Sequence, residues 1–250
     1  MKSQEENNLH LEGRNVVIEA LKSERDIDKI LVQQGSNEGS IKKIIAEARD
    51  RRIVVQTVAK AKLDELSETK RHQGVIAFVS AHNYVAVEDI LENARSRGEK
   101  PFILVLDGIT DPYNLGAIIR TANISGAHGV IIPKRRAVGL SAVVAKASAG
   151  AIAHIPIAKV TNIPRTIEEL KQEGIWVACA DMDGSPMYAT DLKGAIALVI
   201  GNEGEGVSRL VKEKCDFIVQ IPMFGQITSL NASVAAGVLM YEVVRQNHFA

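Results

Sequence analysis

The chain has few cysteines, no long apolar run and no excess of charge, and each shortage excludes a class of protein. The two cysteines, Cys179 and Cys215, lie in separate apolar runs without CxxC spacing, so we predict buried structural thiols and no metal site. No apolar run approaches the roughly 20 residues of a membrane span. The opening MKSQEENNLH lacks the apolar segment of a secretory signal, so we expect a cytoplasmic protein without membrane association.

The composition is that of an ordinary soluble protein. Of the 250 residues, 46% are hydrophobic and 24% are charged, which leaves room for one large domain or two ordinary ones. A net charge of zero argues against a nucleic-acid partner, but the charges are unevenly distributed. From Lys100 to Arg165 there are eight basic residues and two acidic ones, Asp107 and Asp111. This stretch is either a face for an anionic partner or an ordinary solvated surface.

Alternating patterns divide the first hundred residues into a small domain and a linker. Residues 1–80 predict a small α/β layer, with Ser40 as the N-cap of its second helix. Helical spacing occurs at 11–24, 40–52 and 61–68, and strand-like runs occur at 29–34, 53–58 and 74–80. The polar stretch 81–100 surrounds one short helical pattern and is expected to be the linker to a second domain at 101–250.

The second domain begins with a series of apolar, β-branched runs separated by helical patterns. The runs are FILVLDG, GVIIP, IPIAKV, IWVACA, AIALVIG and FIVQIPM, starting at residues 102, 129, 155, 175, 195 and 217. Nearly continuous apolar strands that alternate with helices predict a parallel sheet covered on both faces. Binding sites in such sheets collect in the loops after the carboxyl ends of the strands. Three of these loops have unusual chemistry.

The first of these loops leads into a helix with a single charge. Asp111 and Pro112 predict a turn, and Asn114 stands where a helix N-cap is expected. Arg120 follows six residues later and is the only charged residue between Asp111 and Lys134. A lone arginine on such a helix is either a structural ion-pair partner or a ligand for an anion.

The second loop, IGNEGEGVS at 200–208, is rich in glycine between a strand and a helix pattern. Such loops usually bind phosphate through backbone N–H groups, but this one carries Glu203 and Glu205 and no lysine. Two carboxylates oppose an anion, so the loop better suits a nucleoside with an ammonium or sulfonium group. The alternative is a helix entry in which the acids complement the helix dipole. No GxGxxG follows the first strand of either domain, which argues against a nicotinamide-dependent enzyme.

The third loop, IPMFGQITSLNASVA at 221–235, leads into a helix rich in small residues. Ser229 is the predicted cap of this helix, and Asn231 and Ser233 add hydrogen-bonding groups. Small side chains let a backbone approach a cofactor or another helix closely. A capped core helix is the simpler alternative for each of these residues.

Together the three loops resemble the SpoU/TrmH family, the ribose 2′-O-methyltransferases of the SPOUT superfamily. The matching motifs are DPYNLGAIIRTA, LVIGNEGEGVS and IPMFGQITSLNASVA, in the family's order. The resemblance implies an α/β catalytic domain with a parallel sheet and a C-terminal trefoil knot, and a homodimer formed through that domain. It also implies S-adenosyl-L-methionine as the cofactor. The implied cofactor-binding residues are Gly201, Ile221, Met223, Ser229 and Leu230, and the implied catalytic residues are Asn114, Arg120, Glu203, Ser229 and Asn231.

The N-terminal part resembles the substrate-binding domain of a subgroup, the bacterial 23S rRNA (guanosine-2′-O)-methyltransferases. The resemblance rests on GRNVVIEAL near the start and RHQGVIAFV at 71–79. It implies ribosomal RNA as the partner, with a guanosine of 23S rRNA as the target. The residues predicted to contact RNA are Arg120, Arg135, Arg136, Lys146 and His72, although His72 is equally well interpreted as a packing or surface histidine. The alternatives are a tRNA, an adenosine of rRNA, or a non-catalytic RNA-binding protein with the same fold.

Overall fold

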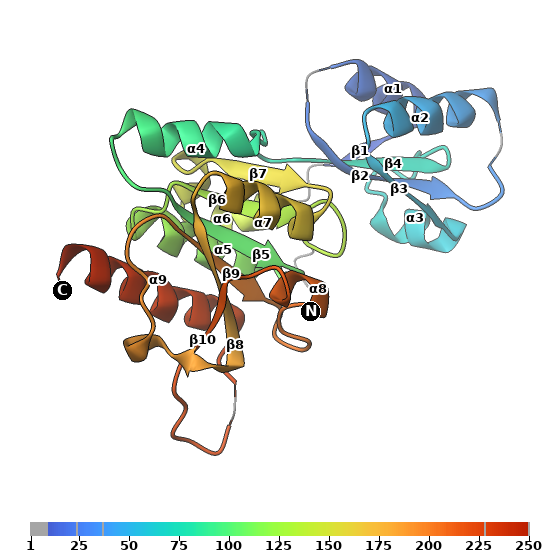
Figure 1. Ribbon diagram of the computed structural model, residues 1–250. Helices are drawn as coiled ribbons and strands as arrows, with labels where there is room; N and C mark the ends of the chain where they lie inside the picture. The colour runs from blue at the N-terminus through green and yellow to red at the C-terminus, as the bar shows by residue number, and fades with distance from the viewer. Residues whose placement is uncertain (1–9, 24, 37, 228, 250) are drawn as a thin grey trace. The chain divides into compact units, whose positions relative to one another are not determined.

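The computed structural model describes residues 10–23, 25–36, 38–227 and 229–249, which form two compact units. The first unit contains the residues up to Asn83 together with Gly139–Val143, and the second contains the rest. Each unit is an α/β layer structure, as the sequence predicts (Figure 1).

The first unit is a mixed sheet with helices on both faces, in the strand order β1-β4-β2-β3. Its elements are β1 (His10–Glu12), α1 (Arg14–Lys22), β2 (Ile27–Gln33), α2 (Gly39–Asp50), β3 (Val54–Val58), α3 (Lys60–Leu66) and β4 (Val75–Val79). Successive side chains of a strand point to opposite faces of the sheet, so neighbouring residues enter different cores. Ile30 packs with Val17 of α1 and Ile44 of α2, whereas its neighbour Leu31 packs with Leu63 of α3.

Two details of this unit differ from the sequence prediction. The helix expected at 11–24 begins only at Arg14, because Leu11 and Glu12 pair with β4 as an edge strand. Ser40 is not the N-cap of α2. The helix begins at Gly39 after Glu38, and no side chain caps it.

The second unit is built on a parallel sheet of six strands, in the order β10-β8-β9-β5-β6-β7. Its strands are β5 (Phe102–Asp107), β6 (Gly129–Pro133), β7 (Ile157–Val160), β8 (Trp176–Pro186), β9 (Ile196–Gly201) and β10 (Phe217–Gln220). Its helices are α4 (Val87–Ser96), α5 (Pro112–Ile124), α7 (Ile163–Gln172), α8 (Arg209–Lys212) and α9 (Ala232–His248). The short helix α6 (Ala142–Ala147) begins with two residues that belong to the first unit and continues with residues of the second. All the strand pairs of this sheet are parallel, which confirms the predicted sheet.

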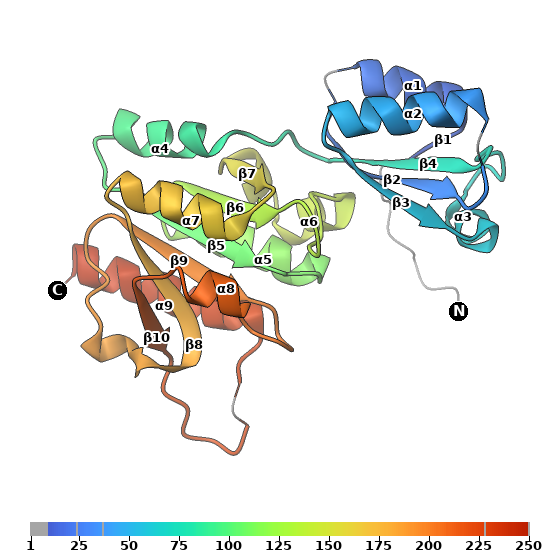
Figure 2. The same ribbon diagram turned by 45° about the vertical axis from the view of Figure 1, so that its right-hand side comes forward.

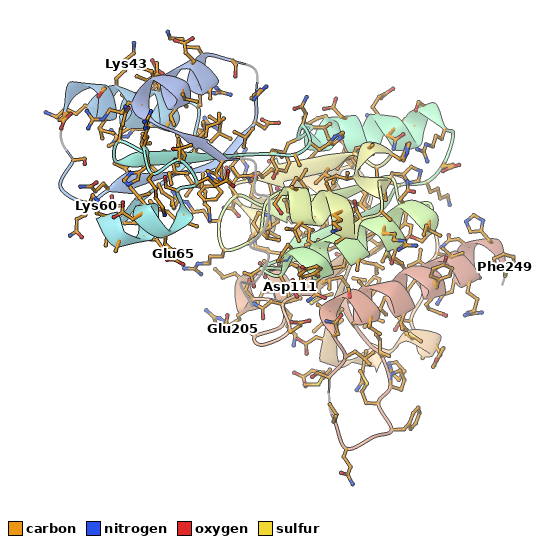
Figure 3. All side chains as sticks on the ribbon, turned by 180° about the vertical axis from the view of Figure 1, so that it is seen from behind. Lys43, Lys60, Glu65, Asp111, Glu205 and Phe249 are labelled. Atoms are coloured by element: carbon orange, nitrogen blue, oxygen red, sulfur yellow. The ribbon has the colours of Figure 1, made fainter. Side chains whose placement is uncertain are left out.

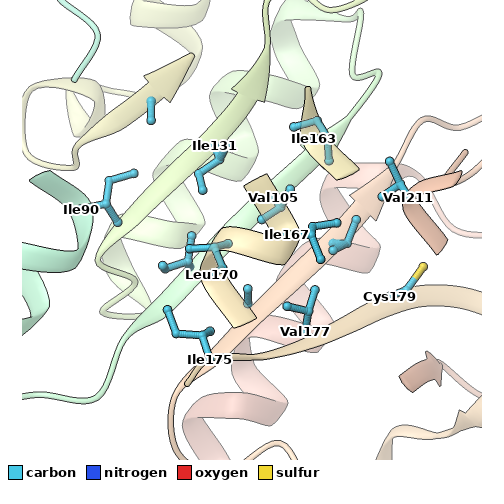
Figure 4. Close-up of a cluster of buried hydrophobic side chains, with 14 of the residues drawn as sticks. Ile90, Val105, Ile131, Ile163, Ile167, Leu170, Ile175, Val177, Cys179 and Val211 are labelled. Atoms are coloured by element: carbon cyan, nitrogen blue, oxygen red, sulfur yellow. The ribbon is translucent and has the colours of Figure 1, made fainter. Parts of the chain in front are cut away.

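Both faces of this sheet are covered (Figure 2). On one face, α4 and α7 bury Ile90, Ile167 and Leu170 against residues such as Val105 (Figure 4). On the other face, α5 packs along α9, and α9 packs against β9. Cys179 belongs to the first of these cores, Cys215 packs beside it, and both thiols are free.

The stretch 81–100, which the sequence suggests is a linker, is largely part of the second unit. The boundary between the units falls at Asn83 and Tyr84, and Val87–Ser96 form α4. Ile90, Leu91 and Ala94 are buried on one face of this helix. The apolar face spans only three residues among many charges, which is why the composition of the stretch is typical of a linker.

Candidate active site

A pocket lies at the edge of the six-stranded sheet where β9 and β10 end, beside the middle of β8. Its volume is about 390 Å³, near the lower end of the range for sites that hold one small ligand. The second and third loops and the middle of β8 line it. The lining residues are Ala180, Asp181, Met182, Ile200, Gly201, Asn202, Glu203, Gly204, Glu205, Gly206, Val219, Gln220, Ile221, Met223, Ser229, Leu230, Ala232 and Ala235. All five residues predicted to bind the cofactor are thus brought together in one cavity.

The glycine-rich loop is closed on itself and uses five of its N–H groups in bonds within the protein. Asn202 and Gly206 exchange two backbone hydrogen bonds, of 3.2 and 3.1 Å. The Asn202 side-chain oxygen accepts from the backbone N–H of Gly204 at 2.9 Å and of Glu205 at 2.7 Å. The N–H of Ser208 donates to the Asp107 carboxylate at 2.8 Å. Five donors that a phosphate-binding loop uses are therefore satisfied inside the protein.

Glycine is required at the start of this loop by the closeness of the chain to itself. A Cβ atom built on Gly201 would overlap the backbone of Gly206 and Val207. Gly206 has a φ of 68°, in the left-handed region that glycine enters most easily. These two glycines let the chain turn back, and the turn leaves the side chain of Glu203 pointing away from the loop to other elements.

Glu203 joins the three predicted motifs in one hydrogen-bonded cluster. Its Oε1 accepts from the side-chain amide of Asn114 on α5 at 2.6 Å and from the side-chain amide of Asn231. The Asn231 amide also donates to Oδ1 of Asn114, with 3.0 Å between nitrogen and oxygen. The three side chains come from positions up to 117 residues apart in the chain. We refer to Asn114, Glu203 and Asn231 as the amide–carboxylate cluster.

The helix caps differ from those predicted, and the difference explains how the cluster is oriented. Asp111 caps α5 by accepting from the N–H of Tyr113 at 2.8 Å, so Asn114 lies buried in the first turn. Asn231, not Ser229, caps α9. Its Oδ1 accepts from the N–H of Ser233 at 2.9 Å and from the Ser233 hydroxyl at 2.6 Å. Because the oxygen of Asn231 is used by the cap, its amide nitrogen must face Glu203.

Arg120 does not join the cluster. Six residues beyond Asn114, it lies about 120° further around the helix axis, and it is exposed. Its side chain has no hydrogen bond or ion pair with any other residue that the structure describes. The structural ion pair considered from the sequence is therefore absent from the described part of the chain, and the guanidinium is available to an external anion.

The predicted RNA contacts have different surroundings. Arg135, Arg136 and Lys146 are exposed. The first two follow the carboxyl end of β6, where the N–H of Val138 donates to the carbonyl of Ile109 in the first loop at 2.9 Å. This bond places the basic segment at the same edge of the sheet as the pocket.

The ring of His72, a predicted RNA contact, is hydrogen-bonded at both nitrogens within the first unit. The side chain is buried, its Nε2 bonds Asp64 at 2.9 Å, and its Nδ1 accepts from the N–H of Gly74 at 3.0 Å. Both ring nitrogens are thus used within the first unit, as expected for the packing histidine that the sequence left as the alternative.

The sequence prediction missed the contribution of β8 to the pocket. Asp181 and Met182 line it, and the ammonium group of Lys212 lies 3.0 Å from the Asp181 carboxylate. Burial alone raises the pKa of Asp181, but the hydrogen bond from Lys212 and those from backbone N–H groups outweigh it and hold the pKa below its usual value. A signal was present, since ACADMDG is also a strand followed by acids. Only the strand order, with β8 between β9 and β10, shows that it reaches the pocket.

Among the described residues, no group of histidine, cysteine and carboxylate side chains has the arrangement of a metal site. The same part of the chain contains no helix long and apolar enough to cross a membrane.

Two family models match adjacent parts of the chain. The SpoU rRNA methylase family matches residues 101–241, and the RNA 2′-O ribose methyltransferase substrate-binding domain matches residues 10–85. A Bacillus subtilis protein that is named as a TrmH family tRNA/rRNA methyltransferase is 51% identical over 237 residues. The match covers 94% of this chain and 95% of that protein. A relative of the same description from Staphylococcus haemolyticus is 48% identical over 239 residues, with the same coverage.

Solved structures show the same fold. An rRNA methyltransferase from Sinorhizobium meliloti has a TM-score of 0.60 and 25% identity, covering 96% of this chain and 87% of its own. The SpoU methyltransferase AviRb from Streptomyces viridochromogenes, solved in complex with AdoMet, has a TM-score of 0.59 and 24% identity, covering 95% and 89%. With an N-terminal RNA substrate-binding domain and a SpoU catalytic domain, the chain belongs to the SpoU/TrmH family of RNA 2′-O ribose methyltransferases.

Proposed function

We propose that this RNA 2′-O ribose methyltransferase acts on a guanosine of 23S rRNA in the cytoplasm, with S-adenosyl-L-methionine bound in the pocket at the ends of β9 and β10. The observation that carries the proposal is the amide–carboxylate cluster. It brings one side chain from each of the three family motifs to the edge of a cavity of ligand size.

The pocket fits this cofactor better than it fits a phosphorylated one. The glycine-rich loop uses its own N–H groups, and Asp181, Glu203 and Glu205 line the cavity, so a phosphate would meet negative charge. A nucleoside with a positively charged sulfonium and an ammonium group meets attraction there instead. Gly201, Ile221, Met223, Ser229 and Leu230 would hold the nucleoside, largely through backbone groups and apolar side chains. When bound, S-adenosyl-L-methionine supplies a methyl group that is already activated.

The residues of the chain then contribute position and charge. Transfer to a ribose hydroxyl is an in-line displacement, in which holding the hydroxyl at the right place supplies much of the rate. Asn114, Asn231 and Ser229 would orient the ribose, and Glu203 holds the two amides in one orientation. Arg120 would stabilise the oxygen as negative charge develops on it. Arg120 does not act as the base, because a guanidinium stays protonated at ordinary pH.

In a homodimer, Arg120 of one copy of the chain would reach the active site at the border of the other copy. Tyr113, Arg120 and Ile124 share one exposed face of α5, since they are seven and four residues apart. Val234 and Tyr241, seven residues apart, are exposed on α9, which packs along α5. An apolar face of this kind around an arginine is typical of a protein interface. We propose that this α5–α9 face forms the homodimer, with the active site at its border.

RNA binding would be shared between the two units. Arg135, Arg136 and Lys146 are exposed cations suited to phosphate groups, which position RNA without reading its sequence. The first unit would select the RNA, as the description of its family model indicates.

Mapping of 2′-O-methylation by primer extension in a strain that lacks the gene tests the target. We expect one stop in 23S rRNA, at a guanosine, to disappear on deletion and to return on complementation. Loss of a stop in tRNA or at an adenosine would replace the proposed target. No change at any ribose would leave a non-catalytic RNA-binding protein.

A further inference from the structure

The loop between β10 and α9 exposes large apolar side chains beside the pocket. Phe224 is 97% exposed and Ile227 is 80% exposed, and residues 221–231 contain no charged side chain. Figures 1 and 2 show this loop extending from the body of the second unit. Exposed side chains of this size have a free-energy cost in water unless a partner covers them.

The same loop also forms a wall of the pocket. Ile221, Met223, Ser229 and Leu230 line the cavity, whereas Phe224, next to Met223, does not. Phe224 therefore adjoins the pocket wall through Met223, and its exposed ring lies outside the space proposed for the cofactor. Asn231, which ends the loop, belongs to the amide–carboxylate cluster where the ribose is expected. The loop thus carries the proposed ribose site at one end and an exposed aromatic ring beside the pocket wall at the other.

The size of the pocket suits a single ligand. A cavity of about 390 Å³ is near the lower limit for one drug-sized ligand, so a bound cofactor would take up most of it. In-line transfer nevertheless requires the 2′-oxygen at the pocket mouth. The base attached to that ribose must then rest on a surface at the rim.

We propose that Phe224 is the stacking surface for the nucleobase of the target nucleotide. This inference rests on the proposed function. An uncharged aromatic ring suits the face of a base, and it offers nothing to a phosphate. Enzymes that act on a nucleotide within folded RNA commonly take the base out of its stack and hold it against aromatic or apolar side chains. Phe224 is on neither α5 nor α9, whose exposed side chains form the proposed dimer face.

Steady-state kinetics of Phe224→Ala test this role, with RNA purified from a strain lacking the gene as the substrate. We expect KM for RNA to rise roughly ten- to a hundredfold, the effect of losing one stacked base. Calorimetric titration with S-adenosylhomocysteine should give an unchanged Kd, and gel filtration an unchanged oligomeric state. Ile227→Ala is the matched control, an equally apolar exposed side chain of the same loop, and should leave KM unchanged. Phe224→Trp should restore KM.

Fluorescence provides a readout that a merely structural role would not change. Trp176 is the only tryptophan, so Trp176→Phe with Phe224→Trp places a single indole at the rim. Its emission should be quenched when RNA binds and unchanged in Ile227→Trp on the same background.

Each contrary result overturns the inference. If KM for RNA is unchanged in Phe224→Ala, the ring does not hold a base. A weakened S-adenosylhomocysteine Kd would assign it to the cofactor, and a changed oligomeric state would assign it to a second copy of the chain. A wild-type protein that transfers no methyl group to ribose overturns the proposed function as well, whereas an active wild type with an indifferent Phe224→Ala overturns only this inference.

Discussion

The side-chain amide nitrogen of Asn231 lies 3.0 Å from Oδ1 of Asn114 and also donates to Oε1 of Glu203. Asn231 ends the third loop, Asn114 is in the first turn of α5, and Glu203 is in the glycine-rich loop. Figure 3 labels Asp111, which caps the helix of Asn114, and Glu205, which is in the same loop as Glu203. The oxygen of the same Asn231 side chain caps α9. One residue therefore begins a helix and fixes the site, and variants can separate these two roles.

Asn231→Asp should keep the cap and destroy the site. A carboxylate still accepts from the N–H of Ser233, so the midpoint of thermal unfolding should stay close to that of the wild type. It cannot donate to Glu203, and it adds a second negative charge beside it, so kcat should fall roughly 100-fold or more. Asn231→Ala, the matched variant, should lose both activity and about 1 kcal/mol of stability. Wild-type kcat in Asn231→Asp would contradict the role of the cluster.

Gly201→Ala should disrupt the cofactor pocket. The new methyl group would overlap the backbone of Gly206 and Val207, which cannot move without opening the loop. Such overpacking typically costs about 1–3 kcal/mol, and calorimetry should show loss of S-adenosylhomocysteine binding. Gly204→Ala is the control, because its Cβ would lie 3.7 Å from Oδ1 of Asn202, an ordinary contact. Equal effects of the two substitutions would show that close packing is not the reason for glycine at 201.

Arg120→Ala should abolish transfer and leave cofactor binding intact. The side chain is exposed, outside the pocket lining, and has no partner in the described chain, so neither folding nor S-adenosylhomocysteine affinity should change. Loss of a charge that stabilises the developing alkoxide should lower kcat roughly 100- to 1,000-fold. Calorimetric titration beside a methylation assay measures both quantities. An active Arg120→Ala enzyme would remove Arg120 from the mechanism.

Substitution of Arg135 and Arg136 by alanine should weaken RNA binding and its dependence on salt together. Each lost phosphate contact should reduce the slope of log K against log salt concentration by about 0.7 to 0.9. Filter binding at several salt concentrations provides the slope for the wild type and for the double variant. An unchanged slope would mean that these arginines face solvent in the complex.

Glu12 should stabilise the first unit down to low pH. Burial raises the pKa of its carboxyl group, but hydrogen bonds from the hydroxyls of Ser67 and Thr69, from the N–H of Glu68 and from His10 outweigh it and lower the pKa to about 2. A lowered pKa contributes stability above the unfolded value of 4.5, and this contribution is lost as the pH falls from there to about 2. Glu12→Gln should cost roughly 1–3 kcal/mol at neutral pH and flatten the pH dependence of unfolding between these limits. The free energy of unfolding of the wild type and of Glu12→Gln is measured with denaturant across this pH range. An equal loss of stability in both proteins would refute the role of Glu12.

The strands and the three loops could be predicted from the sequence, because apolar β-branched runs and glycine loops are local signals. The cap of α9 could not be distinguished locally, since Ser229 and Asn231 are equally good cap residues two positions apart. For α5 a local signal was present, because proline is favoured at the first helical position and Pro112 therefore marks Asp111 as the cap. The bonds of Asn114 and Asn231 to Glu203, far away in the chain, are tertiary contacts that no local pattern predicts.

Two other features depend on tertiary structure in the same way. Asp181 reaches the pocket only because β8 lies between β9 and β10. The burial of His72 depends on its bonds to Asp64 and to the N–H of Gly74. The trefoil knot remains a prediction of the resemblance, because a knot depends on the path of the whole chain and not on any local pattern.

The most direct test of the account is methyl transfer by the purified protein. Wild type and Asn231→Asp are incubated with S-adenosyl-L-methionine labelled on its methyl group and with RNA from a strain lacking the gene. We expect the wild type to label the 2′-oxygen of a guanosine in 23S rRNA, and Asn231→Asp, folded to the same degree, to label it roughly 100-fold more slowly or less. Label on a base, label introduced equally by both proteins, or no label from the wild type would contradict this expectation.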